Sequence, residues 1–205
     1  MTLKEYAQEN LVSAVPADVR VWHWTGRPGA VSVIAQRITD GADCSDMGQG
    51  ALGPGLYVST SPVDLMDRGQ NVLAAVLRSG TRVLMVDPLL FQVGTPEILD
   101  VTLARLRWPF RFPRFHGKVD PEHAVPPNEV VPALLRQLDL PAAAYIYGLH
   151  LAFVVRSGAC LQFDPEIDAV ELVAEYAKQN PHDRPMLLPA NAVEQWLARQ
   201  GRRPR

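Results

Sequence analysis

GPGLYVSTS, residues 53 to 61, is a glycine-rich turn that runs into a short apolar segment holding one tyrosine, Tyr57. Glycines also lie just upstream, in GQGALG at 48 to 53, so the backbone there can take positive φ or approach a ligand closely. The apolar run predicts a β-strand. One ring beside a flexible turn suits a flat, polar ligand such as a nucleotide, but alone the pattern is more often only a turn before a strand.

A second stretch, VRVWHWTG at 19 to 26, belongs with the first. Its residues alternate, with Val19, Val21 and His23 on one side of a predicted strand. The other side carries Arg20, Trp22 and Trp24. The last core-side position is therefore a histidine, which is either a core side chain paired with a backbone carbonyl or a ligand-binding group.

Short helices and strands are predicted along the rest of the chain. Thr2 and Glu5 form a capping box for a helix that ends before Pro16, and Ser61 caps a helix that Gly69 stops. Further helices are expected at 30–39, 96–107, 128–138 and 190–200, and further strands at 72–77, 81–87, 142–148, 149–155, 159–164 and 169–174. Consecutive strands without a βαβ rhythm predict an α+β fold in one domain, residues 1 to 205.

Composition narrows the class of protein. The 205 residues are 47% hydrophobic and 20% charged, values typical of an ordinary globular protein. A net charge of -2 argues against general nucleic-acid binding. The two cysteines, Cys44 and Cys160, have no Cys/His cluster beside them, so reduced thiols and no metal are expected. We find no apolar run of roughly 20 residues for a membrane span and no secretory signal. We expect a cytoplasmic monomer, or one that a non-classical secretion system delivers into a host or target cell.

Residues 105 to 118, RLRWPFRFPRFHGK, interleave arginines with aromatic rings and prolines. The prolines exclude regular structure, so this is a loop or an edge segment. Two interpretations stand. The rings tuck under the core while the arginines stay solvated, or the segment is a surface that docks a substrate protein.

Taken together, HWT at 23 to 25 and GPGLYVSTS resemble the ADP-ribosyltransferases of the diphtheria-toxin and poly(ADP-ribose)-polymerase branch. That branch carries a histidine in an H-G-T/S motif, a tyrosine in a G-x-G-hydrophobic-Y-hydrophobic-S/A motif, and a late acid or glutamine. The similarity is strongest from Val21 to Asp87. It implies a split β-sheet core with short flanking helices, NAD as co-substrate and no metal.

The resemblance also implies roles for individual residues. NAD is cleaved at its nicotinamide glycosidic bond through an oxocarbenium-like state, so the enzyme must hold the dinucleotide and stabilise positive charge on the ribose. By similarity, His23 bonds a ribose hydroxyl, the backbone at Trp24 holds the nicotinamide amide, and Tyr57 stacks on the nicotinamide ring. Thr25 orients the strand end. Gly55, Ser59 and Ser61 complete the predicted binding set.

This chain departs from the family pattern in two places. Trp24 stands where the family has glycine, which alters the nicotinamide pocket. The late catalytic residue is also displaced, because direct alignment of residues 157 to 165 puts Ala159 at its position. The nearest suitable side chains are Gln162 and Glu166. Glu171 and Glu122 are more remote candidates.

The predicted function is therefore mono-ADP-ribosyl transfer from NAD to a protein side chain, by a domain that looks like a bacterial effector or toxin. The motif layout is similar to effectors that modify a threonine of ubiquitin, which makes ubiquitin a candidate target. The alternatives are an NAD glycohydrolase, an RNA 2'-phosphotransferase, and an inactive module that binds NAD, ADP-ribose or a partner. The phosphotransferase needs arginines at its pocket, and Arg20, on the strand face opposite His23, does not supply one.

Overall fold

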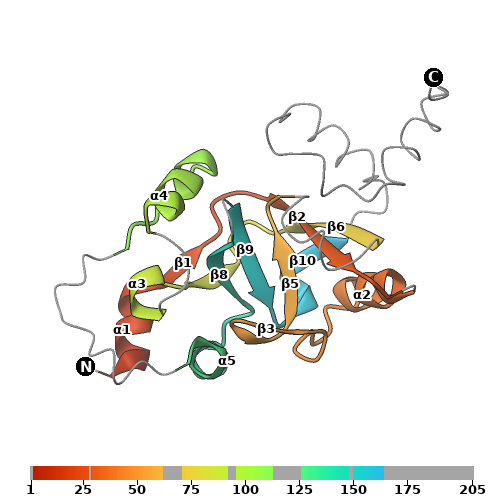
Figure 1. The fold of residues 1–205 in the computed structure, drawn as a ribbon, viewed down its shortest axis with the longest axis horizontal. Coiled ribbons are helices and arrows are strands. Elements are labelled where there is room, and N and C mark those ends of the chain that lie inside the picture. The colour runs from red at the N-terminus through yellow and green to blue at the C-terminus, as the bar shows by residue number, and fades with distance from the viewer. Residues whose placement is uncertain are drawn as a thin grey trace.

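A computed structural model describes residues 2–27, 29–61, 71–91, 96–112, 126–147 and 150–163 (Figure 1). The fold is α+β, as the sequence predicts, with a large mixed sheet and short helices around it. Three predicted elements lie outside the described residues: the helix after Ser61, the strand at 169–174 and the helix at 190–200.

The main sheet has eight strands in the order β1-β7-β8-β9-β5-β2-β6-β10. Its strands are β1 (Val12–Ala14), β2 (Val19–Thr25), β5 (Leu56–Ser59), β6 (Asn71–Leu77), β7 (Arg82–Met85), β8 (Ala142–Tyr147), β9 (His150–Val155) and β10 (Leu161–Phe163). All neighbours are antiparallel except β7 and β8. Strands β3 (Gln49–Gly50) and β4 (Gly53–Pro54) form a separate hairpin that leads into β5.

The sheet is divided where the two motif strands meet. Strands β2 and β5 are joined through a single residue pair, Trp22 and Ser59. By contrast, β2 pairs with β6 along its whole length, from Val19–Leu77 to Thr25–Asn71. The sheet therefore behaves as two halves that separate beside His23 and Tyr57, which agrees with the predicted split core.

The turn at 78 to 81 moves the chain from one half to the other. Both predicted strands flanking it are present, but β6 pairs with β2 and β10, whereas β7 pairs with β1 and β8. Gly80 donates its N–H to the carbonyl of Val15 at 2.8 Å, which fixes the turn beside β1. The chain returns to β8 through α3 (Pro88–Phe91), α4 (Pro96–Arg105) and α5 (Pro127–Gln137). This is the connection that makes β7 and β8 parallel.

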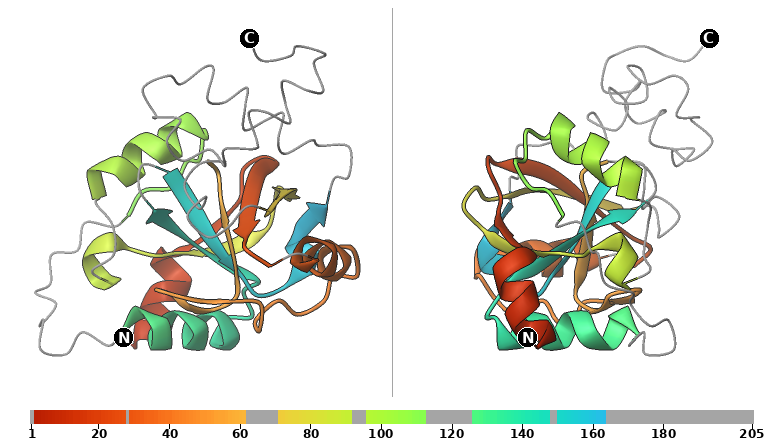
Figure 2. Two further views of the ribbon diagram at one scale, coloured as in Figure 1. Left: turned by 45° about the vertical axis from the view of Figure 1, so that its right-hand side comes forward. Right: turned by 90° about the vertical axis from the view of Figure 1, so that its left-hand side faces the viewer.

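The helices cover both faces of the sheet (Figure 2). Helix α1 (Leu3–Asn10) begins with the predicted capping box, in which Glu5 N–H donates to Thr2 Oγ1 at 3.2 Å and Thr2 N–H donates to the Glu5 carboxylate at 2.6 Å. It packs with α5 over the face that carries Ala143, Ala152 and Val154. Helix α2 (Ala30–Thr39) packs Ile34 and Ile38 on the opposite face. The core is therefore two apolar layers with the sheet between them.

The described part of the arginine–aromatic segment, 105 to 112, packs as the first interpretation predicts. Trp108 is buried, stacks on Phe153 with ring centroids 6.4 Å apart, and donates its indole N–H to Ser13 Oγ at 2.9 Å. Phe110 and Phe112 pack against the same core. The arginines of this part, Arg105, Arg107 and Arg111, are exposed.

Both cysteines are buried free thiols, and burial raises the pKa of Cys160 to about 12. The helices of the described ranges are all too short or too polar to cross a membrane. In the same ranges, we find no group of three or more His, Cys, Asp or Glu side chains arranged to hold a metal ion.

Candidate functional site

His23 sits near the end of β2, where the two halves of the sheet part. Its Nδ1 lies 2.7 Å from the backbone carbonyl oxygen of Tyr57 on β5. A carbonyl oxygen only accepts, so Nδ1 carries the proton and donates. Burial lowers the pKa of His23, which keeps the imidazole neutral near pH 7. Its Nε2 is then a hydrogen-bond acceptor, suited to bind a hydroxyl group.

Tyr57 is held by the hairpin that precedes it. Its hydroxyl donates to the carbonyl oxygen of Gly53 at 2.5 Å and accepts the backbone N–H of Leu52 at 3.2 Å. Burial raises the pKa of the phenol, so Tyr57 stays neutral. Because the hydroxyl is engaged within the hairpin, the ring is the part of Tyr57 that can serve a ligand.

The glycines around Tyr57 are explained by close packing within the protein. A Cβ on Gly50 would lie 2.5 Å from Cζ of Tyr57, so the hairpin backbone rests against that ring. Gly53 has φ +88°, and a Cβ there would collide with Pro132 and with the Asn128 carbonyl on α5. A Cβ on Gly55 would collide with the side chain of Val154 on β9. The sequence predicts positive φ or a close approach, and the close approach is to the protein's own side chains and backbone.

A small pocket opens in front of Tyr57. Its volume is about 220 Å³, and its lining comprises His23, Trp24, Gln49, Gly50, Ala51, Tyr57, Tyr145 and Tyr147. Among the described residues of this lining, none is Asp, Glu, Lys or Arg. Ligand pockets for drug-sized molecules span roughly 300–1,000 Å³, so this one suits a single ring.

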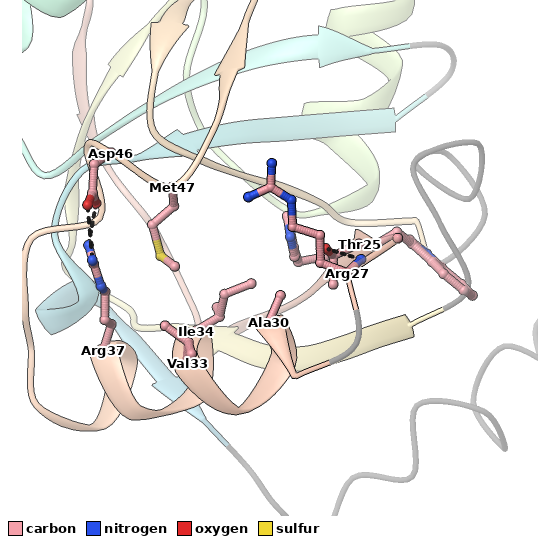
Figure 3. A pocket seen from close by; sticks show the side chains of 11 residues that line it. Thr25, Arg27, Ala30, Val33, Ile34, Arg37, Asp46 and Met47 are labelled. Carbon is pink, nitrogen blue, oxygen red and sulfur yellow. Dashed lines mark hydrogen bonds and ion pairs between the residues drawn. The ribbon is translucent and has the colours of Figure 1, made fainter.

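A larger pocket of about 730 Å³ lies on the other side of the β2 end. Figure 3 shows Ala30, Val33 and Ile34 of α2 along one wall, with Met47 facing them. The guanidinium of Arg37 pairs with the Asp46 carboxylate at one end. Thr25 and Arg27 lie at the other end, where the backbone N–H of Arg27 donates to Thr25 Oγ1 at 3.3 Å.

The two pockets meet at His23 and Trp24, which line both of them. The described lining of the smaller pocket is aromatic and uncharged, whereas the larger pocket has an apolar wall, with Arg27 at one end and the Arg37–Asp46 pair at the other. Trp24 is 3% exposed, so its bulky ring lies inside the protein and not across the surface. A ligand with a ring at one end and a polar, charged middle could span both pockets past His23.

The other predicted binding residues are placed as follows. Thr25 lines the larger pocket. Ser59 and Ser61 are fully buried, and the backbone N–H of Ser61 donates to Ser59 Oγ at 3.0 Å, so the Ser59 hydroxyl holds the end of β5. Neither serine lines the two pockets, and Gly55 does not either.

The candidates for a third catalytic residue are not brought to the site within the described ranges. Gln162 is an exposed residue of edge strand β10, opposite Val76 of β6, and lines neither pocket. Ala159 is exposed in a 3-10 turn, Gly158–Cys160, that Ser157 caps. Glu122, Glu166 and Glu171 lie outside the described residues. The neighbours of β5 are β9 and β2, and the described part of the 159–164 segment lies beyond β6 instead.

Most residues of the two pockets were not predicted as site residues, among them Tyr145, Tyr147 and Arg27. Tyr145 and Tyr147 stand two positions apart in AAAYIYG, and this spacing places both on one face of β8. Arg27 directly follows the HWTG motif. The alternation of Tyr145 and Tyr147 along β8 was the signal in the sequence for these two side chains. A local pattern does not show which strand lies next to β8.

Comparison with known proteins shows likeness to solved structures. No protein-family model and no curated protein matches the sequence. Among solved structures, the chain is similar to one in the crystal structure of the M. tuberculosis MbcT–MbcA toxin–antitoxin complex, with 13% identity and a TM-score of 0.46. The likeness covers 84% of this chain and 97% of that chain. A similarity at this level does not identify a function.

Proposed function

We propose that this chain binds NAD across the two pockets and transfers ADP-ribose to a protein side chain, releasing nicotinamide. The observation that carries the proposal is that two pockets meet at His23 and Trp24: a small one whose described lining is aromatic and uncharged, and a larger one with Arg27 at one end. NAD has the same division, with a flat nicotinamide at one end and a diphosphate and adenosine at the other.

The nicotinamide ring is assigned to the smaller pocket. Tyr57 offers its ring there, because its hydroxyl is bound to the hairpin. Stacking between rings contributes on the order of 1 kcal/mol beyond the burial of area. The half-buried position of Tyr57 leaves part of the side chain accessible for this contact.

His23 is assigned to a ribose hydroxyl. The carbonyl of Tyr57 fixes the proton on Nδ1, so Nε2 accepts a hydrogen bond from the hydroxyl. The lowered pKa supports this role, since a protonated imidazole could not accept. A hydrogen bond to the ribose orients the sugar whose C1′ carries positive charge in the transition state.

The diphosphate and adenosine are assigned to the larger pocket. Arg27 makes no ion pair with any residue in the described ranges, so its charge is available to a phosphate. Arg37 is already paired with Asp46. The apolar side chains of Val33, Ile34 and Met47 provide a surface for a purine.

The third catalytic group is proposed to come from the segment after β10. Strand β10 pairs antiparallel with β6, as β2 does, so β10 and β2 run in the same direction. Along β10 the register advances from the level of Val19 to the level of Val21, toward His23. Glu166 follows three residues after Phe163. A carboxylate there would activate the acceptor, and without one the chemistry reduces to hydrolysis or binding.

The test is to incubate the full chain with labelled NAD and a cell lysate, with purified ubiquitin as a second acceptor. Label on a discrete protein that disappears in His23→Ala and Tyr57→Ala supports transfer. Free ADP-ribose without labelled protein indicates hydrolysis, and unconsumed NAD contradicts an enzymatic function. Glu166→Gln is compared with Gln162→Ala, and a loss below tenfold excludes that residue as a principal catalyst.

A further inference from the structure

Three arginines stand on the surface where α4 ends and in the segment that follows it. Arg105, Arg107 and Arg111 are exposed, and none of them forms an ion pair with another residue of the described ranges. They line neither of the two pockets. In Figures 1 and 2, α4 lies on the opposite side of the molecule from α2, the helix along the larger pocket. These charges are therefore separate from the site described above.

The backbone that carries the arginines is anchored by the residues between them. Trp108 is buried against Phe153 and bonded to Ser13, and Phe110 and Phe112 pack on the same core. The core therefore fixes every second residue of this segment, while the arginines point outward. A surface held in this way loses less conformational freedom when it binds a partner.

Helix α4 ends in a Schellman motif that has Arg107 at its left-handed position. The Trp108 N–H donates to the Leu103 carbonyl at 2.8 Å, and the Arg107 N–H donates to the Ala104 carbonyl at 3.0 Å. Arg107 has φ +52°. Glycine is the usual residue at this position, and Asn, Asp and His are the other residues enriched in this conformation. The backbone does not favour arginine here, which points to a role for its side chain.

Helix α5 ends in the same way and provides a comparison. The Asp139 N–H donates to the Arg136 carbonyl at 3.4 Å, the Leu140 N–H donates to the Leu135 carbonyl at 2.9 Å, and Asp139 has φ +50°. Aspartate visits this conformation readily, because its short polar side chain can form local hydrogen bonds. The end of α5 thus carries a residue that the backbone accepts, whereas the end of α4 does not.

The surface around the arginines is both cationic and apolar. Val101 is 54% exposed and lies one turn before Arg105, so the two are neighbours on α4. Ala104 is exposed beside them, and the exposed Asp100 forms no ion pair in the described ranges. Arginine is enriched at protein–protein interfaces. Nucleic-acid binding instead needs a clear cationic excess, and this chain has a net charge of -2.

We propose that Val101, Arg105, Arg107 and Arg111 form a docking surface for a partner protein that presents an acidic segment with an apolar side chain in it. Carboxylates of the partner pair with the guanidinium groups, and its apolar side chain covers Val101. The inference does not depend on the proposed function, because this surface can bind a partner whether or not the pockets consume NAD.

The experiment measures binding of three labelled probes to the full chain by fluorescence anisotropy. The probes are a glutamate peptide with leucine at every fourth position, an all-glutamate peptide of the same length, and a DNA duplex of comparable length. We expect the glutamate–leucine peptide to bind most tightly, and added salt to weaken its binding. No binding of either peptide, or tighter binding of the duplex than of both peptides, overturns the proposal.

Two triple variants with the same change in net charge locate the binding surface. Changing the three arginines of the surface to glutamine should lower the affinity for the glutamate–leucine peptide by about tenfold, since each exposed ion pair contributes little. The control variant changes three exposed arginines elsewhere to glutamine: Arg20, Arg82 and Arg136. Equal losses in both variants would show that the peptide responds to net charge alone, which overturns the proposal.

Val101→Ser tests the apolar part of the surface. The glutamate–leucine peptide should lose its advantage over the all-glutamate peptide in this variant, because the exposed side chain that its leucine covers is gone. An advantage that persists unchanged contradicts the place of Val101 in the surface.

Arg107→Gly separates binding from folding. Glycine suits a φ of +52°, so the midpoint of thermal unfolding should rise, while the affinity for the glutamate–leucine peptide falls by about two- to fivefold. Asp139→Gly is the matched control, since it makes the same backbone change at the end of α5 and should leave the affinity unchanged. A lower midpoint with unchanged affinity in Arg107→Gly would show that this arginine serves stability, and would overturn its assignment to the docking surface.

Discussion

The Nδ1 of His23 donates to the main-chain carbonyl of Tyr57 across the line where the sheet divides, with the two atoms 2.7 Å apart. The strands that carry these residues share only the pair Trp22–Ser59. The two strands pair so little here that this hydrogen bond is what keeps the two motif residues next to each other. It also fixes the imidazole tautomer, which leaves Nε2 as the acceptor atom of a side chain that lines both pockets.

The stability of the protein should fall as the pH drops below about 6.5. Burial lowers the His23 pKa, so in this window the unfolded chain binds a proton that the folded chain does not. The contribution is present above the ordinary value of 6.5 and is lost as the pH falls toward the folded-state pKa. The slope from this group is at most about 1.4 kcal/mol per pH unit. Urea unfolding of the wild type and of His23→Gln from pH 7.5 to 5 measures this pH dependence. If the free energy of unfolding changes with pH in parallel for both proteins, His23 is not its source.

Tyr57→Phe should destabilise the fold while keeping the ring. The variant removes the donor to the Gly53 carbonyl and the acceptor for the Leu52 N–H. Leaving such groups unpaired costs about 1–3 kcal/mol. The free energy of unfolding measures the effect, with Tyr147→Phe as the control for loss of a tyrosine hydroxyl from the same pocket. Equal stability of Tyr57→Phe and wild type would show that the hairpin does not depend on this hydroxyl.

Gly50→Ala should displace the ring of Tyr57. The added Cβ would lie 2.5 Å from Cζ, so either the hairpin or the ring must move. Because a shift of about 1 Å can cost about 100-fold in rate, we expect NAD consumption to fall by more than about tenfold. Gly48→Ala is the matched control, since its Cβ would lie 4.0 Å from the same ring but 3.1 Å from the carbonyl oxygen of Gly55, so it crowds the hairpin backbone and not the ring. Similar losses in both variants would mean that the hairpin, and not the ring position, is what matters.

Arg27→Ala should weaken the binding of NAD. The guanidinium lies at the end of the larger pocket, and its removal should raise KM by about three- to tenfold, since the side chain is exposed and partly screened. Arg20→Ala is the control, because this exposed arginine is on β2, the strand that leads to Arg27, and lines neither pocket. Equal KM values for the two variants would contradict the assignment of the diphosphate to this pocket.

Trp108→Ala should cost far more stability than Arg111→Ala. Trp108 is buried against Phe153 and bonded to Ser13, and large-to-small changes at such aromatic positions cost about 3–5 kcal/mol. Arg111 is exposed, and substitutions of this kind stay within about 0.5 kcal/mol. Thermal unfolding compares them. A large loss in Arg111→Ala would show that the arginines of this segment are structural.

Local signals predicted the parts of the fold that depend on neighbouring residues. The capping box at Thr2, the alternation that puts Val21 in one core layer and Trp22 in another cluster, and the strand around Tyr57 are all present. Each follows from a pattern of period two or from a capping residue, which a sequence displays directly.

The pairing between distant strands could not be predicted from the sequence. Strands β6 and β7, which flank the turn at 78 to 81, fall in different halves of the sheet. The segment that contains Gln162 was expected near the site, but it forms β10 beside β6, whereas β9 lies beside β5. The tyrosines of β8 reach the pocket only because their rings extend over a neighbouring strand. Such placements depend on contacts between residues about 80 to 90 positions apart, as between Tyr57 and Tyr145, which no local periodicity encodes.

Release of nicotinamide from NAD by the purified full-length chain tests the central claim most directly. The proposal predicts that nicotinamide accumulates with the wild type and falls by at least about tenfold in both His23→Ala and Tyr57→Ala, while Arg20→Ala stays near the wild type. NAD that remains intact with the wild type, or release that both variants retain, would contradict it.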